Sequence, residues 1–148
     1  MITTTVNRQK GVPVETREPL FERVIGPLTR TDFVRFAGAG GDFNPIHHDE
    51  VYAVSHGHPS VFAMGMLTAS LAASCLSEVY DLAAVQSFGV RFLAPVWPGD
   101  VLRFSGYRAE AADKDAILQI DFVAVDENGV GKLSGYSAVR VPDSEVHS

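Results

Sequence analysis

The residues best suited to chemistry lie in one polar stretch of the chain, Gly40–Asp49. It contains a carboxylate, Asp42, and an imidazole five positions later, His47. In an extended chain these side chains could lie about 16 Å apart, but the two glycines and Pro45 favour a curled loop of defined shape that brings them together. A carboxylate and an imidazole that face one space can act as a general acid and base, because the two groups have different reference pKa values.

A purely structural explanation of this loop is also open. Asp42 can close an Asx turn, and Asn before Pro is common in turns. The string from Gly41 to His47 matches, position for position, the G-D-x-N-P-[ILV]-H signature of the MaoC-like (R)-specific enoyl-CoA hydratase/dehydratase family. The chain resembles that family from about Phe21 to Val141, and the resemblance implies that Asp42 and His47 form a catalytic pair.

The resemblance also implies the reaction. Such an enzyme interconverts trans-2-enoyl-CoA and (R)-3-hydroxyacyl-CoA by adding or removing water, without a cofactor or a metal. We expect Asp42 and His47 to share activation of the water and return of the proton to Cα. Which group performs which step is left open at this point.

A third candidate catalytic residue is Gly65, near the start of a predicted long helix. Unpaired N–H groups at a helix start carry partial positive charge and suit a developing oxyanion. In the family, a glycine just ahead of a Met-Leu or Leu pair donates its N–H to the thioester carbonyl, and the matching glycine here is Gly65, followed by Met66 and Leu67. The alternative for Gly65 is close packing of the helix on a sheet.

Two further residues are candidates for substrate binding. Met64 stands where many members of the resembled family carry histidine, so a polar group is missing beside the expected oxyanion site. This difference can alter substrate range or pocket polarity. Asn44 can donate to the thioester or shape the loop, and we favour loop shaping.

The histidines near the loop raise the question of a metal site. His47, His48, His56 and His58 fall within twelve residues, with Asp49 among them, and both residue types are good zinc ligands. Their spacing fits no common zinc pattern, and the motif explains His47 without a metal, so we expect none. We expect His48 to point away from His47, and His56 and His58 to be exposed loop residues.

Composition limits the classes of function and partner. The chain has 148 residues, of which 46% are hydrophobic and 20% charged, as expected for one domain with a sizeable core. A net charge of −6 gives no basic surface for nucleic acid or an anionic membrane. The one cysteine, Cys75, excludes an internal disulfide framework and fits a reducing compartment. The first ten residues lack the apolar core of a signal peptide, and we expect a cytoplasmic protein.

Periodicity and turn residues predict the elements that position the candidate site. A capping-box variant at Thr29 and Asp32 begins a short helix that stops at glycines and delivers the chain into the loop. Ser60 is the expected N-cap of a long helix that runs to about Tyr80; it has no polar face and should be buried. The other expected elements are a strand at 21–25, a short helix at 49–54, and strands at 84–94, 101–110, 116–125 and 130–141, with an Asn128-Gly129 hairpin turn between the last two.

This order of elements predicts an α+β fold. The leading strand pairs back onto four antiparallel strands, and the curved sheet wraps around one long central helix. That is the hot-dog fold, which is also the fold of the resembled family. We expect residues 1–13 to be a loose N-terminus, 14–141 the single domain and 142–148 a polar tail.

An edge strand and part of the helix would need cover, so we expect a homodimer. Two other functions remain open at this point. One is a hot-dog acyl-CoA thioesterase. The other is a subunit of a hetero-oligomeric hot-dog hydratase that acts on a bulky acyl group, such as a steroid, or on an acyl group bound to a carrier protein.

Overall fold

The computed structural model describes residues 18–109 and 116–142. The predicted loose N-terminus at 1–13, the turn at 113–115 and all but the first residue of the predicted tail lie outside the described residues. The elements, with η marking a single 3₁₀ turn, are β1 (Phe21–Ile25), α1 (Arg30–Gly40), η1 (Pro45–His47), α2 (Glu50–Ser55), α3 (Gly65–Ser77), η2 (Leu82–Ala84), β2 (Val85–Phe92), β3 (Leu102–Arg108), β4 (Ile117–Val125) and β5 (Gly131–Arg140).

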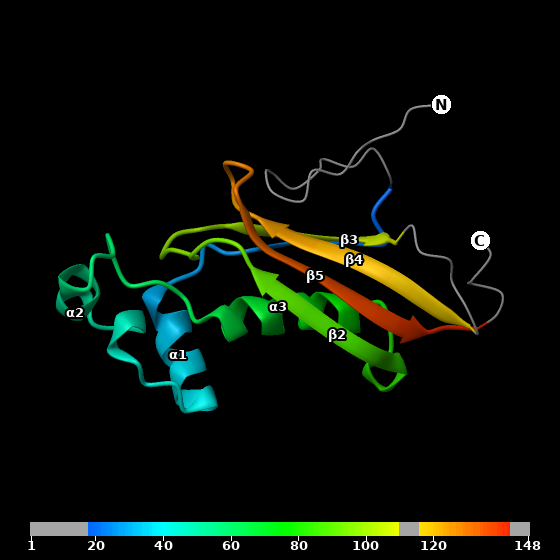
Figure 1. Cartoon of the computed structure of the whole chain (residues 1–148), viewed down its shortest axis with the longest axis horizontal. Coiled ribbons are helices and arrows are strands. Elements are labelled where there is room, and N and C mark those ends of the chain that lie inside the picture. The colour runs from blue at the N-terminus through cyan, green and yellow to red at the C-terminus, as the bar shows by residue number, and fades with distance from the viewer. Residues whose placement is uncertain (1–17, 110–115, 143–148) are drawn as a thin grey trace.

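Within the described residues, five strands form one antiparallel sheet in the order β1-β3-β4-β5-β2. The leading strand pairs back onto β3, as predicted, and the predicted α+β architecture is confirmed. Figure 1 shows α3 lying along one face of the sheet, with α1 and α2 beyond one end of it. The site loop therefore belongs to a segment that extends past the end of the sheet.

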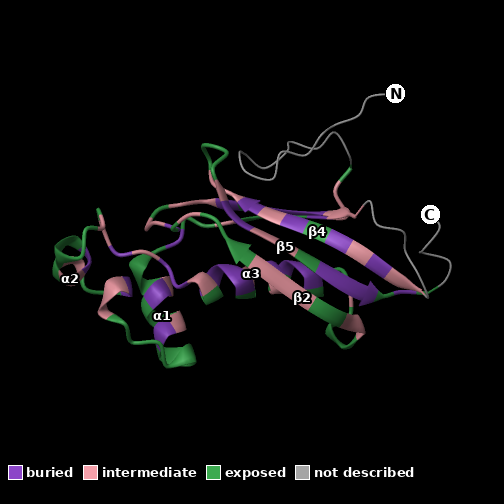
Figure 2. Ribbon diagram, in the orientation of Figure 1, coloured by how far each residue is buried: buried purple, intermediate pink, exposed green. Residues whose placement is uncertain are grey.

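The core lies between α3 and the facing side of the sheet. In β4, buried residues alternate with more exposed ones, which is the period of a strand with one face on the core; Figure 2 shows this alternation. The helix contributes Leu67, Ala72 and Leu76 to the same apolar cluster. Burial of these apolar groups is the main force that holds the helix on the sheet.

The long helix is shorter than predicted. It begins at Gly65 rather than after Ser60, and it ends at Ser77 rather than near Tyr80. The residues before it, 61–64, have no regular secondary structure, and the Ala63 N–H donates to the Val96 carbonyl at 2.9 Å instead of entering a helical turn. At 13 residues the helix is about 20 Å long.

The helix is also not buried on every side. Met66, Ser70, Ser74 and Ser77 are exposed and lie three or four positions apart, so they share one face. Apart from Met66, this face carries only serines, which explains why the helix packs with its other side against the sheet. Among the described residues, no helix is both long and apolar enough to cross a bilayer.

Local sequence signals set both ends of α1, as predicted. The Thr29 hydroxyl accepts from the Asp32 N–H at 3.2 Å, and the Asp32 carboxylate accepts from the Thr29 N–H at 2.8 Å. These two bonds are the predicted capping box. The Thr29 hydroxyl also donates to the Asp32 carboxylate at 2.6 Å, and this bond, followed by the one from the Thr29 N–H, lowers the pKa of Asp32. The helix is closed by its C-cap Gly41, whose φ of +70° is a left-handed conformation that glycine adopts without strain.

A buried charged network fixes the connection between β2 and β3. The Lys132 ammonium lies 3.0 Å from Asp100 and 3.2 Å from Asp126, and it donates to the Pro95 carbonyl at 3.0 Å. Burial alone would raise the pKa of Asp126, but hydrogen bonds from the Val130 N–H and from Lys132 outweigh it and lower that pKa. A buried lysine with three oxygen partners is a satisfied ion and holds this loop in place.

Candidate active site

The site loop is shaped by its own polar side chains. Asp42 Oδ1 accepts from the Asn44 N–H at 3.3 Å, so the Asx turn considered for Asp42 is present. Asn44 Oδ1 in turn accepts from the Ile46 N–H at 3.1 Å, which supports the loop-shaping interpretation of Asn44. Pro45 opens the single turn of η1, and this turn carries His47 back towards Asp42.

The imidazole of His47 is buried and oriented by a backbone carbonyl. Nδ1 lies 2.7 Å from the carbonyl oxygen of Phe62. Because a carbonyl oxygen only accepts, Nδ1 must carry the proton in this contact. In the neutral ring, Nε2 is then left with a free lone pair.

The structure brings Asp42 and His47 together. The second carboxylate oxygen of Asp42, Oδ2, lies 3.8 Å from His47 Nε2, with the two side chains 50% and 11% exposed. This distance is too long for a direct hydrogen bond. A water about 2.8 Å from both atoms could donate one hydrogen to each of these two acceptors. The arrangement can therefore orient a nucleophilic water and take a proton from it.

Phe62 was not identified from the sequence, although it contacts His47 twice. Besides its carbonyl bond, its ring meets the His47 ring edge-on at 5.3 Å. The same ring packs against Trp97 at 5.8 Å and against His58 at 4.8 Å. The contact with His47 spans fifteen residues and joins a ring nitrogen to a main-chain carbonyl, so no side-chain pattern in the sequence indicates it.

The other histidines are placed largely as expected. His48 is exposed, and its Nε2 lies 3.3 Å from the Phe43 carbonyl rather than against Asp42 or His47. His56 is exposed and stacks on Tyr52. The expectation for His58 was wrong, because its contact with Phe62 leaves it only partly exposed.

Gly65 is the first residue of α3, three positions after Phe62. As the first helical residue, it has no carbonyl one turn earlier in the helix to accept its N–H. A Cβ at this position would lie 2.9 Å from the ring of Phe92 on β2, so the packing explanation of Gly65 also has a contact to support it. Met64, immediately before the helix, is buried, and Asn44 is exposed.

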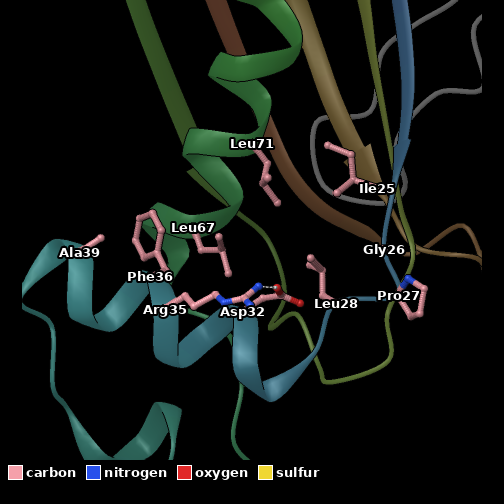
Figure 3. Close-up of a pocket in the computed structure, with 10 residues that line it drawn as sticks. All are labelled: Ile25, Gly26, Pro27, Leu28, Asp32, Arg35, Phe36, Ala39, Leu67 and Leu71. Carbon is pink, nitrogen blue, oxygen red and sulfur yellow. Dashed lines mark ion pairs between the residues drawn. The ribbon is translucent and has the colours of Figure 1, made fainter.

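A separate groove lies between α1, α3 and the connection from β1 to α1 (Figure 3). It has a volume of about 510 Å³, and the ion pair of Asp32 and Arg35, 3.8 Å apart, lies on one wall. Its lining residues are Ile25, Gly26, Pro27, Leu28, Asp32, Arg35, Phe36, Ala39, Leu67 and Leu71. None of the five candidate site residues lines this groove, so it is distinct from the space between Asp42 and His47.

Comparison with known proteins identifies a family and a fold. The model of the MaoC like domain family matches residues 3–128. The 3-hydroxyacyl-thioester dehydratase X of Mycobacterium tuberculosis is 36% identical over 69 residues, which are 47% of this chain and 24% of that protein. A solved structure described as a MaoC-like dehydratase is 32% identical, with a TM-score of 0.77 over 87% of this chain and 41% of that one.

A further solved structure, from the ChsH1-ChsH2 complex of Mycobacterium tuberculosis, has a TM-score of 0.72 and is 22% identical over 82% of this chain and 93% of that one. At this identity the likeness concerns the fold alone. The shared architecture is the hot-dog fold predicted from the sequence. The match to the curated dehydratase covers about a quarter of that protein's length.

Proposed function

The chain belongs to the MaoC-like domain family, and from that premise we propose that it is an acyl-thioester hydratase/dehydratase that interconverts trans-2-enoyl and (R)-3-hydroxyacyl thioesters. The observation that carries the proposal is the pair of acceptors, Asp42 Oδ2 and His47 Nε2, set 3.8 Å apart, a separation that one water can bridge. The dehydratase activity named for the relative from Mycobacterium tuberculosis supports the same reaction class.

In the hydration direction, the pair takes one proton from the water as its oxygen bonds to Cβ of the enoyl group. The electron pair of the double bond moves towards the thioester carbonyl, whose oxygen gains negative charge. A proton returned by the pair to Cα completes the addition. Addition of water is redox-neutral, so the balance of this reaction needs no electron carrier.

Two features of the protein would stabilise the charges that develop on His47 and on the thioester oxygen. The Phe62 carbonyl, which accepts from Nδ1, stabilises His47 when Nε2 gains a proton, because the ring then carries positive charge. The N–H of Gly65 lies at the start of α3, where the helix dipole favours a negative oxygen. Gly65 is therefore the proposed oxyanion donor, with Asn44 and Met64 as residues that shape the surroundings.

We propose that two copies assemble through the edge of the sheet at β2, which pairs within the chain only with β5 among the described strands. Apolar side chains are exposed on β2 and α3, including Phe92 on β2 and Met66 on α3. Light scattering during size-exclusion chromatography should give about twice the chain mass of 16.0 kDa. The ChsH1-ChsH2 complex makes a hetero-oligomer the alternative, and a stable monomer alone would contradict self-assembly.

The reaction is tested with crotonyl-CoA and a longer trans-2-enoyl-CoA. The expected result is loss of enoyl absorbance, (R)-3-hydroxyacyl-CoA as the product on chiral analysis, and no free thiol. Release of free coenzyme A without a hydroxyacyl product would instead identify a thioesterase. If no enoyl thioester reacts, whether carried by coenzyme A or by a carrier protein, and with or without a co-purified second hot-dog chain, the proposal is wrong.

A further inference from the structure

One carboxylate oxygen, Oε2 of Glu50, joins three segments around the site. It lies 2.7 Å from Arg30 Nη1 at the start of α1. It also accepts from the Ser60 hydroxyl at 3.2 Å and from the Val61 N–H at 3.3 Å. Arg30 Nη2 donates to the same Ser60 hydroxyl at 3.2 Å, which closes the cluster. The starts of α1 and α2 are thereby tied to the stretch that leads into α3.

This cluster lies next to the bond that orients His47. Val61, which donates to Glu50, directly precedes Phe62, whose carbonyl accepts from His47 Nδ1. Glu50 itself follows His47 by three residues. The bonds His47–Phe62 and Glu50–Val61 therefore cross-link the same two stretches of chain at neighbouring positions.

The carboxylate of Glu50 is not needed to begin its own helix. Asp49 is the N-cap of α2, and its side chain accepts from the Tyr52 N–H at 3.0 Å. The hydrogen bond from Arg30 lowers the pKa of Glu50, so the carboxylate is charged at neutral pH. Because the partners of the Glu50 carboxylate come from other segments, its charge-assisted hydrogen bonds hold those segments together.

We infer that Glu50, together with Arg30, is a positioning residue for His47. By fixing Val61, it holds the Phe62 carbonyl against Nδ1 and so keeps the free lone pair of Nε2 directed at Asp42. The effect on turnover rests on the proposed function, whereas the effect on the orientation and tautomer of the ring does not.

The chain offers a matched control for this inference. Arg23 and Glu78 form another ion pair with similar side-chain exposure, 50% and 49% against 52% and 43% for Arg30 and Glu50. Exposed ion pairs of this kind usually contribute little to stability. Because the Arg23–Glu78 pair joins β1 to the residue after α3, its loss should leave His47 unchanged.

The direct readout is the tautomer of His47, measured by ¹⁵N NMR of the full-length, histidine-labelled protein at about pH 8.5, where an ordinary histidine is neutral. His47→Gln identifies the His47 signals by their loss. In the wild type, Nδ1 should carry the proton. Glu50→Ala should give a mixture of both tautomers, Glu50→Gln a smaller change because its amide oxygen can still accept from Val61, and Glu78→Ala no change.

The kinetic readout is hydration of crotonyl-CoA by the same variants. Glu50→Ala should lower kcat about tenfold with KM within about twofold, as expected when the catalytic geometry is lost and ground-state binding is kept. Glu50→Gln should fall between Glu50→Ala and the wild type. Urea unfolding of each variant shows that the folded protein is being compared.

The inference is overturned if His47 keeps a single Nδ1–H tautomer in Glu50→Ala, or if Glu78→Ala changes the spectrum as much. Should Glu50→Ala fail to fold, Glu50→Gln and Arg30→Met take its place: each weakens the cluster but keeps an oxygen that can accept from Val61, so each should give a smaller but detectable fraction of the other tautomer, and a single Nδ1–H tautomer in both would overturn the inference. A wild type that hydrates no thioester would refute the proposed function, and the NMR comparison would still decide the role of Glu50.

Discussion

Two regions of the molecule are held together by different forces. One is the sheet with α3, and the other is the site segment, residues 30–64. In the sheet, four antiparallel strand pairings and an apolar cluster define the structure. In the site segment, single polar side chains bond to distant backbone groups, as His47 does to Phe62 and Glu50 to Val61. Stability should therefore depend mainly on the first region and turnover mainly on the second, and substitutions can separate the two.

The largest effect on stability should come from the apolar core beneath the sheet. Phe104 on β3 is 1% exposed and lies in the apolar cluster. Phe104→Ala should lower the free energy of unfolding by about 3–5 kcal/mol, because it leaves a cavity. Urea unfolding measures this loss, and crotonyl-CoA hydration per folded molecule should remain within about twofold. A large loss of turnover in the folded fraction would show that the two regions are not separable.

A smaller effect, mainly on turnover, is expected at Gly65, where the two regions meet. Gly65→Ala places a methyl group 2.9 Å from the Phe92 ring, which is half-exposed and can turn aside. The free energy of unfolding should change by less than about 1 kcal/mol, the scale of a glycine-to-alanine change in a helix. Hydration should fall about tenfold if the thioester must approach this N–H closely.

The double variant Gly65→Ala, Phe92→Ala separates the two explanations of Gly65. Removal of the ring relieves the packing conflict and leaves the added methyl group beside the N–H. We expect hydration to stay low in the double variant, with Phe92→Ala alone as its control. Recovery to the level of that control would assign Gly65 to helix–sheet packing.

The capping box of α1 should contribute a modest amount of stability. Thr29→Ala should lower the free energy of unfolding by about 1 kcal/mol, the usual effect of losing an N-cap. Asp32 makes the free energy of unfolding depend on pH, because hydrogen bonds from Thr29 hold the pKa of Asp32 in the folded protein below the reference value of 3.8. The stabilisation from the Asp32 carboxylate is fully present above pH 3.8. It is lost as the pH falls through the lower pKa that Asp32 has in the folded protein.

Urea unfolding of the wild type and Asp32→Asn at pH 7 and near pH 3 checks this sign. The difference in unfolding free energy between the two proteins should narrow at the lower pH. An equal difference at both pH values would mean that the charge of Asp32 has no part in the cap.

The smallest effect is expected in the groove between α1 and α3. Ala39 is exposed and lines this groove, which contains none of the candidate site residues. Ala39→Leu should change the free energy of unfolding by less than about 0.5 kcal/mol, as for most surface substitutions. Hydration of short and long enoyl thioesters should also be unchanged. A loss of hydration confined to long enoyl thioesters would contradict this expectation. It would place the acyl chain in this groove, between the site segment and α3.

Local signals were enough to predict much of the fold. The strand Phe21–Ile25 has the predicted bounds, and α1 has the predicted capping box and glycine stop, because each depends on residues close in sequence. The start of α3 was misplaced because the Ala63 N–H bonds to the Val96 carbonyl, 33 residues away in sequence, and so is not part of a helical turn. The burial of Lys132 was likewise not predicted, since its partners come from two separate turns.

The candidate site could be predicted in part. The motif placed Asp42 and His47 together, and the loop chemistry of Asn44 followed from its own sequence. The contacts of Phe62 and Glu50 could not be predicted, because each joins a side chain to a backbone group eleven or more residues away. Such contacts are determined by how the site segment packs, which no local pattern encodes.

The central claim is that Asp42 and His47 activate a water for an enoyl thioester. The most direct measurement is the rate of crotonyl-CoA hydration by the wild type, Asp42→Asn and His47→Gln, with urea unfolding as the control for folding. Each substitution removes a proton acceptor with little change in shape, so both variants should lose about 10²–10⁴-fold in kcat. Their unfolding free energies should stay within about 1 kcal/mol of the wild type. Folded variants that turn over substrate at the wild-type rate would contradict the account.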